Sequence, residues 1–490
     1  MANYITSVGM EVHAELQTNS KMFCRCAVAF GGEPNTRVCP VCLGLPGSLP
    51  VPNRMAVEMV LKTALALNCK VAMHSLFHRK NYFYPDLPKA YQVSQYGEEN
   101  PIGFHGFLEI PDPVTGTKRV SIRRVHLEED TGKLLHLPSG GSGVDFNRAG
   151  VPLMEIVSGF PPDIHTADES REYLMQLRMI LIYLGVCDGK MEEGSMRCEP
   201  NISVRPDTTE TLGTKTELKN LNSFRAVQLG VAFETRRQIA VLEGGGKVLQ
   251  ETRGWNDGNE TSYAMRLKES ENDYRYFEDP DLVPIEFTEE YVESIRASLP
   301  ELPLAKSQRY QTELGFNAKE AGVLVADKNW ASFFEMGVAE GGDPKLLSNW
   351  MNSDFARLLN ETGQVIAESE VDAQHDLSKI SASHLVELIS HIQRGDINGK
   401  TAKTMFDEMF RTGARAGELL AKSNLSQISD TDEIVKWCRE AMAENPGPVE
   451  KYKNGQTNTM GFLVGQVMRK SQGRANAPLV QDIMRAELDA

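Results

Sequence analysis

The chain has 490 residues, with 52 Lys and Arg against 67 Asp and Glu, which gives a formal charge of −15. At about 100–200 residues per domain, this length predicts about two to four domains. The charged fraction of 24% and the hydrophobic fraction of 41% exclude wholesale disorder. The acidic balance excludes a nucleic-acid binder that is basic over its whole surface, but it leaves room for a local basic patch.

No segment of the sequence has the pattern of a membrane span or of a signal peptide. The most apolar stretch, residues 55–67, is interrupted by Glu58 and Lys62, and a span needs about 20 apolar residues. The N-terminus has neither a basic start nor a long apolar segment. We therefore expect a cytoplasmic protein.

The first part of the chain, from residue 1 to about residue 290, is dominated by short strand patterns and Gly/Pro turns. Residues 5–17 alternate between apolar and polar side chains, which predicts a strand with Glu11 and His13 on one face. Both side chains can point at one ion or substrate, although a solvated polar face is the alternative. Helices are expected at residues 54–67 and 166–184.

Four of the eight cysteines are clustered, and they follow the spacing C-x-C-x12-C-x2-C. A tetrahedral zinc ion needs four thiolates, and two short turns joined by a loop supply them. Four thiolates leave no open position, so the zinc would be structural. The alternative is four unrelated cysteines. The predicted zinc ligands are Cys24, Cys26, Cys39 and Cys42.

Two later strand patterns carry carboxylates where apolar residues are expected. In residues 122–133, a period of two places Glu129 on the more apolar side and Glu128 on the other, more solvated side. In residues 150–157, Glu155 lies in the middle of a continuous apolar run, which predicts a strand buried on both faces. The alternative for Glu155 is a structural ion pair with Arg148 or Arg124.

Two such carboxylates and a Glu-x-His strand form an oxygen-rich ligand set that suits Mg²⁺ better than zinc. Phosphate chemistry often uses this ion, yet the sequence has no Walker P-loop, so ATP would need a different site. Residues 79–92 interleave cations with aromatic rings, which suits a base or an adenosine beside phosphate contacts. A merely adhesive surface is the alternative. Residues 191–198 and 215–225 are dense in hydrogen-bonding groups and also predict parts of a binding cleft.

A composition change marks the end of this first part. Residues 269–301 are strongly acidic, and beyond them the chain has helical patterns. Apolar residues recur with helical spacing over residues 385–392, Gly395 can end that helix, and Asn398 can cap a helix over residues 399–412. We expect an α+β protein with a β-rich domain at residues 1–293, a helical domain at 294–404 and a helical tail at 405–490.

Eight of these segments together resemble the GatB family, the B subunits of the aspartyl/glutamyl-tRNA(Asn/Gln) amidotransferases. The resemblance covers essentially the whole chain in order. The segments are 8–16 (VGMEVHAEL), 80–89 (KNYFYPDLPK), 126–130 (HLEED), 145–153 (DFNRAGVPL), 191–198 (MEEGSMRC), 218–225 (LKNLNSFR), 273–277 (DYRYF) and 461–470 (GFLVGQVMRK).

The resemblance implies a cradle-shaped catalytic domain and an ATP-dependent ligase reaction. The side-chain carboxylate of Glu or Asp misacylated on tRNA-Gln or tRNA-Asn is phosphorylated, and ammonia then displaces the phosphate. It also implies a heterotrimer with an amidase-family glutaminase and a small third protein that braces the two. The implied Mg²⁺ ligands are Glu11, His13, Glu129 and Glu155, and the implied phosphate or carboxylate contacts are Lys80, Lys89 and Arg148.

The tail is the part expected to bind tRNA. Residues 451–474 carry five cations and no acid, and phosphate contacts need such a local patch. A solvated helix end is the alternative for these cations. A second hypothesis for the whole chain is a non-catalytic, zinc-containing tRNA-binding scaffold. The five cations are Lys451, Lys453, Arg469, Lys470 and Arg474.

Overall fold

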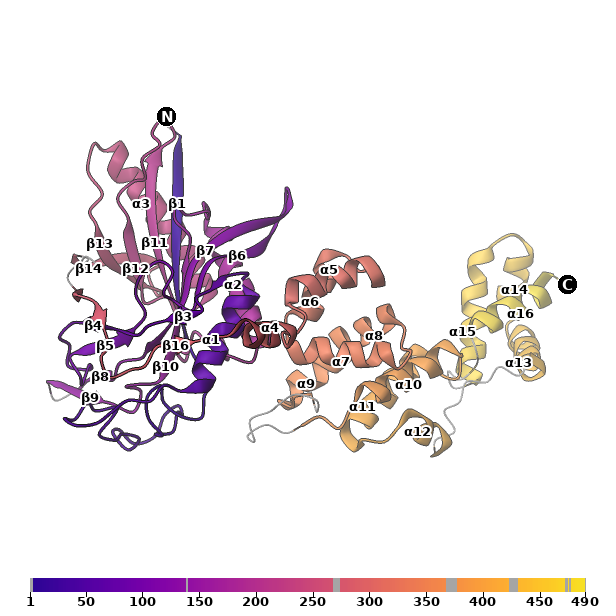
Figure 1. Cartoon of the computed structure of the whole chain (residues 1–490). Coiled ribbons are helices and arrows are strands. Elements are labelled where there is room, and N and C mark those ends of the chain that lie inside the picture. Colours follow the sequence, from indigo (N-terminus) through magenta and orange to yellow (C-terminus); the bar gives the residue numbers. More distant parts are fainter. Residues whose placement is uncertain are drawn as a thin grey trace. The chain divides into compact units, whose positions relative to one another are not determined.

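The structure is a computed structural model of the chain, in which residues 3–137, 140–267, 274–366, 377–422, 431–471, 475 and 477–489 are described. Arg474, one of the five predicted tRNA contacts, lies outside these described residues, as does Asp273 of the family-like segment 273–277. The described chain forms two compact units, Met1–Lys306 and Ser307–Ala490 (Figure 1). A large sheet lies in the first unit and the second is helical, which confirms the α+β class.

The first unit is built on a mixed sheet that has nine strands within the described residues. Neighbouring strands are antiparallel except for the parallel pair β12 and β13. From one edge to the other, the order is β14 (Thr261–Leu267), β13 (Glu251–Asn256), β12 (Thr216–Lys219), β11 (Met196–Pro206), β1 (Tyr4–Glu15), β10 (Pro152–Ser158), β7 (Gly116–Glu129), β6 (Gly103–Asp112) and β2 (Lys70–Val71).

Strand β1 confirms the predicted alternation and gives the sheet two different faces. Val8, Met10 and Val12 are fully buried, whereas Glu11 and His13, which alternate with them, are only half-buried. Successive side chains of a strand point to opposite faces, so the apolar set packs into the core and the polar set lines the other face. We call the face that carries Glu11 and His13 the polar face of the sheet.

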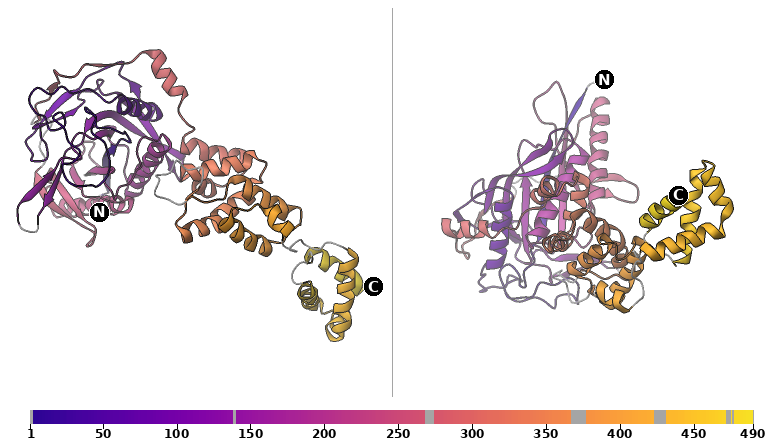
Figure 2. Two further views of the ribbon diagram at one scale, coloured as in Figure 1. Left: turned by 90° about the horizontal axis from the view of Figure 1, so that it is seen from below. Right: turned by 90° about the vertical axis from the view of Figure 1, so that its right-hand side faces the viewer.

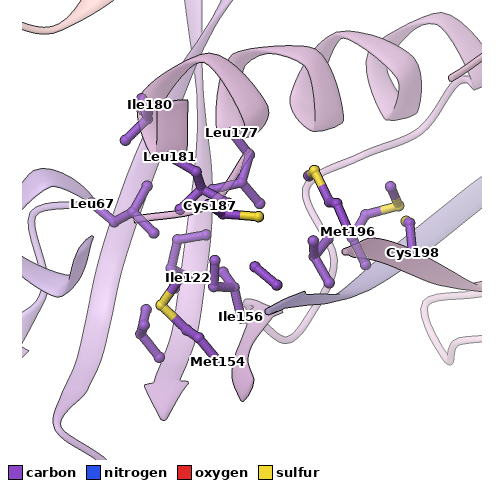
Figure 3. Packing of buried hydrophobic residues seen from close by; sticks show 14 of the residues in the cluster. Leu67, Ile122, Met154, Ile156, Leu177, Ile180, Leu181, Cys187, Met196 and Cys198 are labelled. Atoms are coloured by element: carbon purple, nitrogen blue, oxygen red, sulfur yellow. The ribbon is translucent and has the colours of Figure 1, made fainter. Parts of the chain in front are cut away.

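Helices cover the apolar face of this sheet. Helix α1 (Arg54–Ala66) contacts β6 and β7, and α2 (Ala167–Tyr183) contacts β6, close to the predicted ranges 54–67 and 166–184. Figure 3 shows Leu177 and Leu181 of α2 among the side chains of Ile122, Met154 and Ile156 from the sheet. Burying one such side chain contributes about 1.5–3 kcal/mol to stability, so packing against α2 determines which face of the sheet is buried.

Helix α3 (Phe224–Glu243) also covers the sheet, packing on β11 and α2, and the sequence patterns did not predict it. The side chains of Glu234 and Gln238 on its buried side are fully enclosed, where a helical apolar stripe would place hydrophobic residues. Glu234 is held there by Arg237 and Arg253. A buried ion pair of this kind interrupts the periodic pattern on which helix prediction depends.

Short strands and one more helix complete the first unit. Strands β4 and β5 hold the two ends of the cation-rich and aromatic-rich segment 79–92, and residues 82–90 form the loop between them. These elements are β3 (His74–Ser75), β4 (His78–Asn81), β5 (Tyr91–Ser94), β8 (Lys133–His136), β9 (Ser142–Asp145), β15 (Phe277–Glu278), β16 (Ile285–Glu286) and α4 (Glu289–Ala297).

The second unit contains two separate hydrophobic cores among its described residues. Figure 2 shows the helices of this unit as ribbons. Helix α11 (Gly399–Thr412) begins and ends as predicted, and the Asn398 side chain accepts a hydrogen bond from the Thr401 backbone N–H. The first core involves α5 (Pro303–Leu314), α6 (Ala318–Val325), α7 (Lys328–Ala339), α8 (Pro344–Trp350), the π-helical turn Met351–Phe355, α9 (Ala356–Thr362), α10 (Ala382–Gln393), α11 and α12 (Ala416–Lys422).

The second core holds the last four helices together as a small bundle. Ile434, Leu463 and Met484 are fully buried in it. The predicted division at 404 falls inside α11, whose residues Ala402 and Met405 share the first core, and the three-domain division stays a prediction. The bundle comprises α13 (Thr431–Glu444), α14 (Pro446–Lys453), the short turn Thr457–Thr459, α15 (Met460–Lys470) and α16 (Ala477–Asp489). None of the helices in the described parts of the chain combines the length and apolar character of a membrane span.

Candidate functional site

A cation cluster, consisting of His13, Glu128 and Glu155, lies on the polar face of the sheet. One ligand atom from each side chain lies within 4.8 Å of the other two. His13 Nε2 is 3.9 Å from Glu155 Oε2 and 4.0 Å from Glu128 Oε2. Two carboxylates and one imidazole at this spacing are a ligand set for a hard divalent cation.

Strand register explains why these three residues meet. His13 on β1 lies directly opposite Glu155 on β10, and Glu155 lies opposite His126 on β7. Residues directly opposite each other project to the same face of a sheet. Glu128 follows His126 by two residues and therefore joins the same face.

The two carboxylates of the cation cluster are buried and held in place by neutral and cationic donors. Burial would raise the pKa of Glu155, but the imidazoles of His126 and His13 outweigh it and hold the pKa well below 4.5. His126 Nε2 is 3.1 Å from Glu155 Oε2 and 3.3 Å from Glu128 Oε1. Gln92 and Ser94 donate to Glu128 at 3.1 and 2.7 Å. The carboxylates are thus ionised and oriented, which suits them to hold a cation.

Glu128 takes the place that the sequence reasoning gave to Glu129. The expectation that Glu128 is the more solvated of the two is wrong, because Glu128 is 3% exposed and Glu129 is 4% exposed. Their side chains leave β7 on opposite faces, so Glu129 does not join His13 and Glu155. Of the two alternative ion-pair partners of Glu155, Arg148 pairs with Asp130 instead. The charge of Arg124 does help to lower the pKa of Glu155.

Glu129 instead forms an ion pair with Lys89. Its Oε1 atom also accepts a hydrogen bond of 3.0 Å from the backbone N–H of Val93. This pair lines a pocket of about 210 Å³ together with Cys42 and Arg79. Lys89 and Glu129 therefore lie together, at a place different from the cation cluster.

Lys80, the other lysine of this segment, faces the cation cluster. Burial would lower the pKa of Lys80, but the nearby Glu128, together with Tyr276, Glu155 and Tyr82, outweighs it and raises the pKa above 10.5. Lys80 also lowers the pKa of Glu128, against the effect of burial. A charged ammonium group at this place can attract an anionic ligand.

Glu11 belongs to a second group, the acid cluster, with Glu199 and Glu217. Their ligand atoms also lie within 4.8 Å of one another. Glu11 lies opposite Glu199 across β1 and β11, so register again brings them together. Lys219 Nζ donates to Glu199 at 2.5 Å and lies 3.5 Å from Glu217, and it balances part of the charge.

Arg148 lies in a mixed group with Asp130, Arg197 and Glu15. Arg197 Nη2 donates to the buried Asp130 at 2.6 Å, and Arg148 Nε lies 3.5 Å from the same oxygen. Arg148 also donates to the backbone carbonyls of Thr131 and Gly132 at 3.1 and 2.9 Å. Burial and the neighbouring Asp130 raise the pKa of Glu15 to about 7.

The four clustered cysteines lie together, with their sulfur atoms within 4.8 Å of one another, and we call them the cysteine cluster. The backbone N–H of Cys39 donates to Cys42 Sγ at 3.2 Å. A hydrogen bond from Cys24 outweighs burial and, with the charge of Lys21, lowers the pKa of Cys42 to about 4. This geometry suits a tetrahedral thiolate site for zinc.

The predicted tRNA-binding side chains differ in their exposure and in their ion pairs. Lys451 and Lys453 lie in the last turn of α14, and Arg469 and Lys470 lie in the last turn of α15. Lys451, Lys453 and Arg469 are at least partly exposed. Lys470 is bound to Glu444 at 2.6 Å and to Glu440 at 3.3 Å.

Sequence reasoning missed several members of these groups. Glu128 and His126 share a period of two with each other, and this signal was present in the sequence. Glu199, Glu217 and Arg197 join through pairing between strands far apart in the chain, which no local pattern reveals. The segments 191–198 and 215–225, predicted as parts of a cleft, do contribute Arg197 and Glu217.

Comparison with known proteins gives matches along nearly the whole chain. The family described as GatB/GatE catalytic domain matches residues 6–293, and the family described as GatB domain matches residues 332–488. The aspartyl/glutamyl-tRNA(Asn/Gln) amidotransferase B subunit from Caldanaerobacter subterraneus is 50% identical, and that from Thermoanaerobacter pseudethanolicus is 51% identical. The protein of this name from Geobacter sulfurreducens is 48% identical, and each alignment covers 99% of both chains. The resemblance is therefore confirmed, and the chain belongs to the GatB family of aspartyl/glutamyl-tRNA(Asn/Gln) amidotransferase B subunits.

Proposed function

We propose that this chain activates and amidates the side-chain carboxylate of Glu or Asp misacylated on tRNA-Gln or tRNA-Asn. The observation that carries the proposal is the cation cluster, whose two buried carboxylates and imidazole share one sheet face. Family membership supports the substrate class, because the relatives are named as B subunits of an Asp/Glu-tRNA amidotransferase. The products are Gln-tRNA-Gln or Asn-tRNA-Asn for translation.

The chemistry explains why phosphate transfer is needed. A free carboxylate resists attack by ammonia because its leaving group would be oxide. Transfer of the terminal phosphoryl group of ATP to the carboxylate gives an acyl phosphate and ADP. Ammonia then attacks the carbonyl carbon, and phosphate leaves with the electron pair of the broken C–O bond. A bound Mg²⁺ ion would neutralise charge on the phosphoryl group during this transfer.

The residues of the polar face divide this work. His13, Glu128 and Glu155 would hold the cation, and His126 fixes the orientation of the two carboxylates, as partners of metal ligands commonly do. The acid cluster offers a second cation position around Glu11. Lys80, which lies near Glu128, would contact the phosphate groups of ATP.

The remaining groups support partner and RNA contacts. Ammonia would come from an amidase-family glutaminase, and a small third protein would complete a heterotrimer. The relatives are named as one subunit of an amidotransferase, which supports such an assembly. The cysteine cluster would hold a structural zinc ion, and the cations Lys451, Lys453 and Arg469 of the tail would contact tRNA phosphates.

The test compares adjacent glutamates of β7 in the complex assembled with its partner proteins. We expect Glu128→Gln to lower ATP-dependent amide formation by more than the about 10–100-fold that loss of a supporting partner of a metal ligand costs. Mn²⁺ affinity, measured by electron paramagnetic resonance, should fall in parallel. Glu129→Gln removes an equally buried charge from the other face and should leave Mn²⁺ affinity unchanged.

Two outcomes would contradict the proposal. Full amide formation by both Glu128→Gln and Glu155→Gln would remove the cation assignment. A wild-type complex that binds tRNA but consumes no ATP in response to misacylated tRNA would favour the non-catalytic scaffold instead. Glutamine hydrolysis by the glutaminase partner reports whether the variant complexes are assembled.

A further inference from the structure

Five tyrosines form a continuous row of rings beside the cation cluster. Tyr96 and Tyr276 are stacked with centroids 4.2 Å apart and planes 9° from parallel. Tyr276 meets Tyr274 edge to face at 6.2 Å, Tyr274 meets Tyr82 at 6.0 Å, and Tyr82 meets Tyr84 at 6.5 Å. We call Tyr82, Tyr84, Tyr96, Tyr274 and Tyr276 the tyrosine row.

Packing alone does not account for the tyrosine row. Aromatic rings that serve a core are enclosed, but Tyr84 is 49% exposed and Tyr96 is 38% exposed. Phe83, beside Tyr84, is 81% exposed. Both ends of the row therefore present aromatic surface to a ligand, and rings with a polar hydroxyl suit a site that is apolar on one side and wet on the other.

The row is connected to the cation cluster through two side chains. Lys80 Nζ lies 5.1 Å from the centroid of Tyr274, and the same ammonium group acts on the charge of Glu128. The Tyr82 hydroxyl lies 3.5 Å from Gln92 Oε1, and Gln92 Nε2 donates to Glu128 at 3.1 Å. The tyrosine row, the ammonium group of Lys80 and the carboxylates of the cation cluster are thus neighbours in this order.

This order of groups matches the order of groups in a nucleotide. A base has a π-face that stacks on any aromatic ring, and its phosphates need cations at the other end. The chain has no P-loop to bind phosphates through its backbone N–H groups. Side chains such as these can supply base and phosphate contacts in its place.

We propose that the tyrosine row binds the adenine ring of a nucleotide whose phosphates face Lys80 and the cation cluster. The inference rests on the proposed function, in which both reactants carry an adenosine. One is ATP, and the other is the 3′-terminal adenosine that bears the misacylated amino acid. The shared chemistry is base stacking, and the experiment distinguishes the two sources.

The test replaces exposed rings in the assembled complex, with Tyr84→Leu and Tyr96→Leu as the ring-removing variants. We expect the dissociation constant for ADP with Mg²⁺, measured by titration calorimetry, to rise by about 5- to 150-fold. Tyr84→Phe and Tyr96→Phe keep the ring and should change it less than their leucine counterparts. Phe160→Leu removes an exposed ring elsewhere in the first unit and should leave ADP binding unchanged.

Kinetics in the same complexes identify the source of the adenine. A higher KM for ATP with an unchanged KM for misacylated tRNA assigns the row to ATP. Unchanged ADP binding with a higher KM for misacylated tRNA assigns it to the terminal adenosine. Leucine variants that melt at the wild-type temperature and keep both constants would overturn the inference.

If Tyr96→Leu disturbs the stack with Tyr276 and the fold, Tyr84→Leu still tests the inference, because Tyr84 is exposed. A wild-type complex that binds ADP through these rings but forms no amide would contradict the proposed function and leave the tyrosine row standing. The two failures are therefore distinguishable.

Discussion

At the scale of single residues, Lys21 shows how the cysteine cluster is tied to the rest of the first unit. Its side chain is fully enclosed, with Nζ 3.7 Å from Cys42 Sγ and 3.2 Å from the carbonyl oxygen of Phe146. Four thiolates around one zinc ion carry an excess of negative charge, and a buried ammonium group offsets part of it.

Cys42 is therefore the residue at which to test the zinc site. We expect about one equivalent of zinc per wild-type chain by elemental analysis and loss of that zinc in Cys42→Ser, because three thiolates hold the ion less tightly. The free energy of unfolding should fall with it, since structural zinc contributes directly to folding. Cys438→Ser changes a buried cysteine outside the cluster and should keep its zinc. A zinc-free wild-type chain with an intact fold would contradict the assignment.

The predictability of individual site residues follows from how local their signals are. Glu155 was identifiable because a carboxylate inside a fully apolar strand has no solvent to explain it. His13 was identifiable from alternation on a single strand. The choice between Glu128 and Glu129 required the register of β7 against β10, which places His126 opposite Glu155 and so puts Glu128 on the shared face. No local pattern contains that register.

At the scale of elements, α2 begins at a charged contact whose effect depends on pH. Glu169 lies in the first turn of α2. Its carboxylate accepts hydrogen bonds of 2.7 Å from Lys118 Nζ and from the backbone N–H of His165. Burial would raise the pKa of Glu169, but these hydrogen bonds outweigh it and lower the pKa below 4.5. The ionised carboxylate therefore stabilises the fold above the unfolded-state pKa near 4.5, and this stability is lost as the pH falls through the lower folded-state pKa.

Glu169→Gln should reveal this contribution. We expect it to lower the free energy of unfolding at pH 7 by about 0.5 kcal/mol, a small value because solvent screens the pair. The difference from wild type should shrink as the pH falls below 4.5. Urea denaturation at both pH values measures it, and Lys118→Met should show the same trend. A difference that grows toward low pH would contradict the assigned sign.

The elements that the sequence predicted best are those in which the capping residues and the hydrophobic periodicity indicate the same bounds. Helix α11 has Asn398 at its start and the left-handed Gly413 after its last residue, so both ends are marked in the sequence. Strand β1 shows regular alternation because one face is buried and the other is polar. Helix α3 does not meet this condition, because its buried side carries Glu234 and Gln238, which also have partners on other elements, Arg253 of β13 and the Ile202 carbonyl of β11.

At the scale of the whole molecule, the charge of −15 is unevenly placed. Carboxylates gather on the polar face of the sheet, where Glu11, Glu199 and Glu217 lie together. The tail bundle has its own hydrophobic core, and its predicted tRNA-binding cations lie at the ends of α14 and α15. Because these helices have their own core, replacing the tail cations changes no residue of the sheet that carries the cation cluster.

This separation makes the tRNA contribution of the tail measurable by itself. We expect replacement of Lys451, Lys453 and Arg469 by Ala in the assembled complex to weaken tRNA binding and to flatten its salt dependence. Each lost phosphate contact lowers the slope of log K against log salt by about 0.7–0.9, so three contacts lower it by about 2–3. Lys470→Ala should change the slope least, because Glu440 and Glu444 already neutralise that ammonium group. Filter binding across a range of salt concentrations measures the slopes, and a triple variant with the wild-type slope would show that these cations make no phosphate contact.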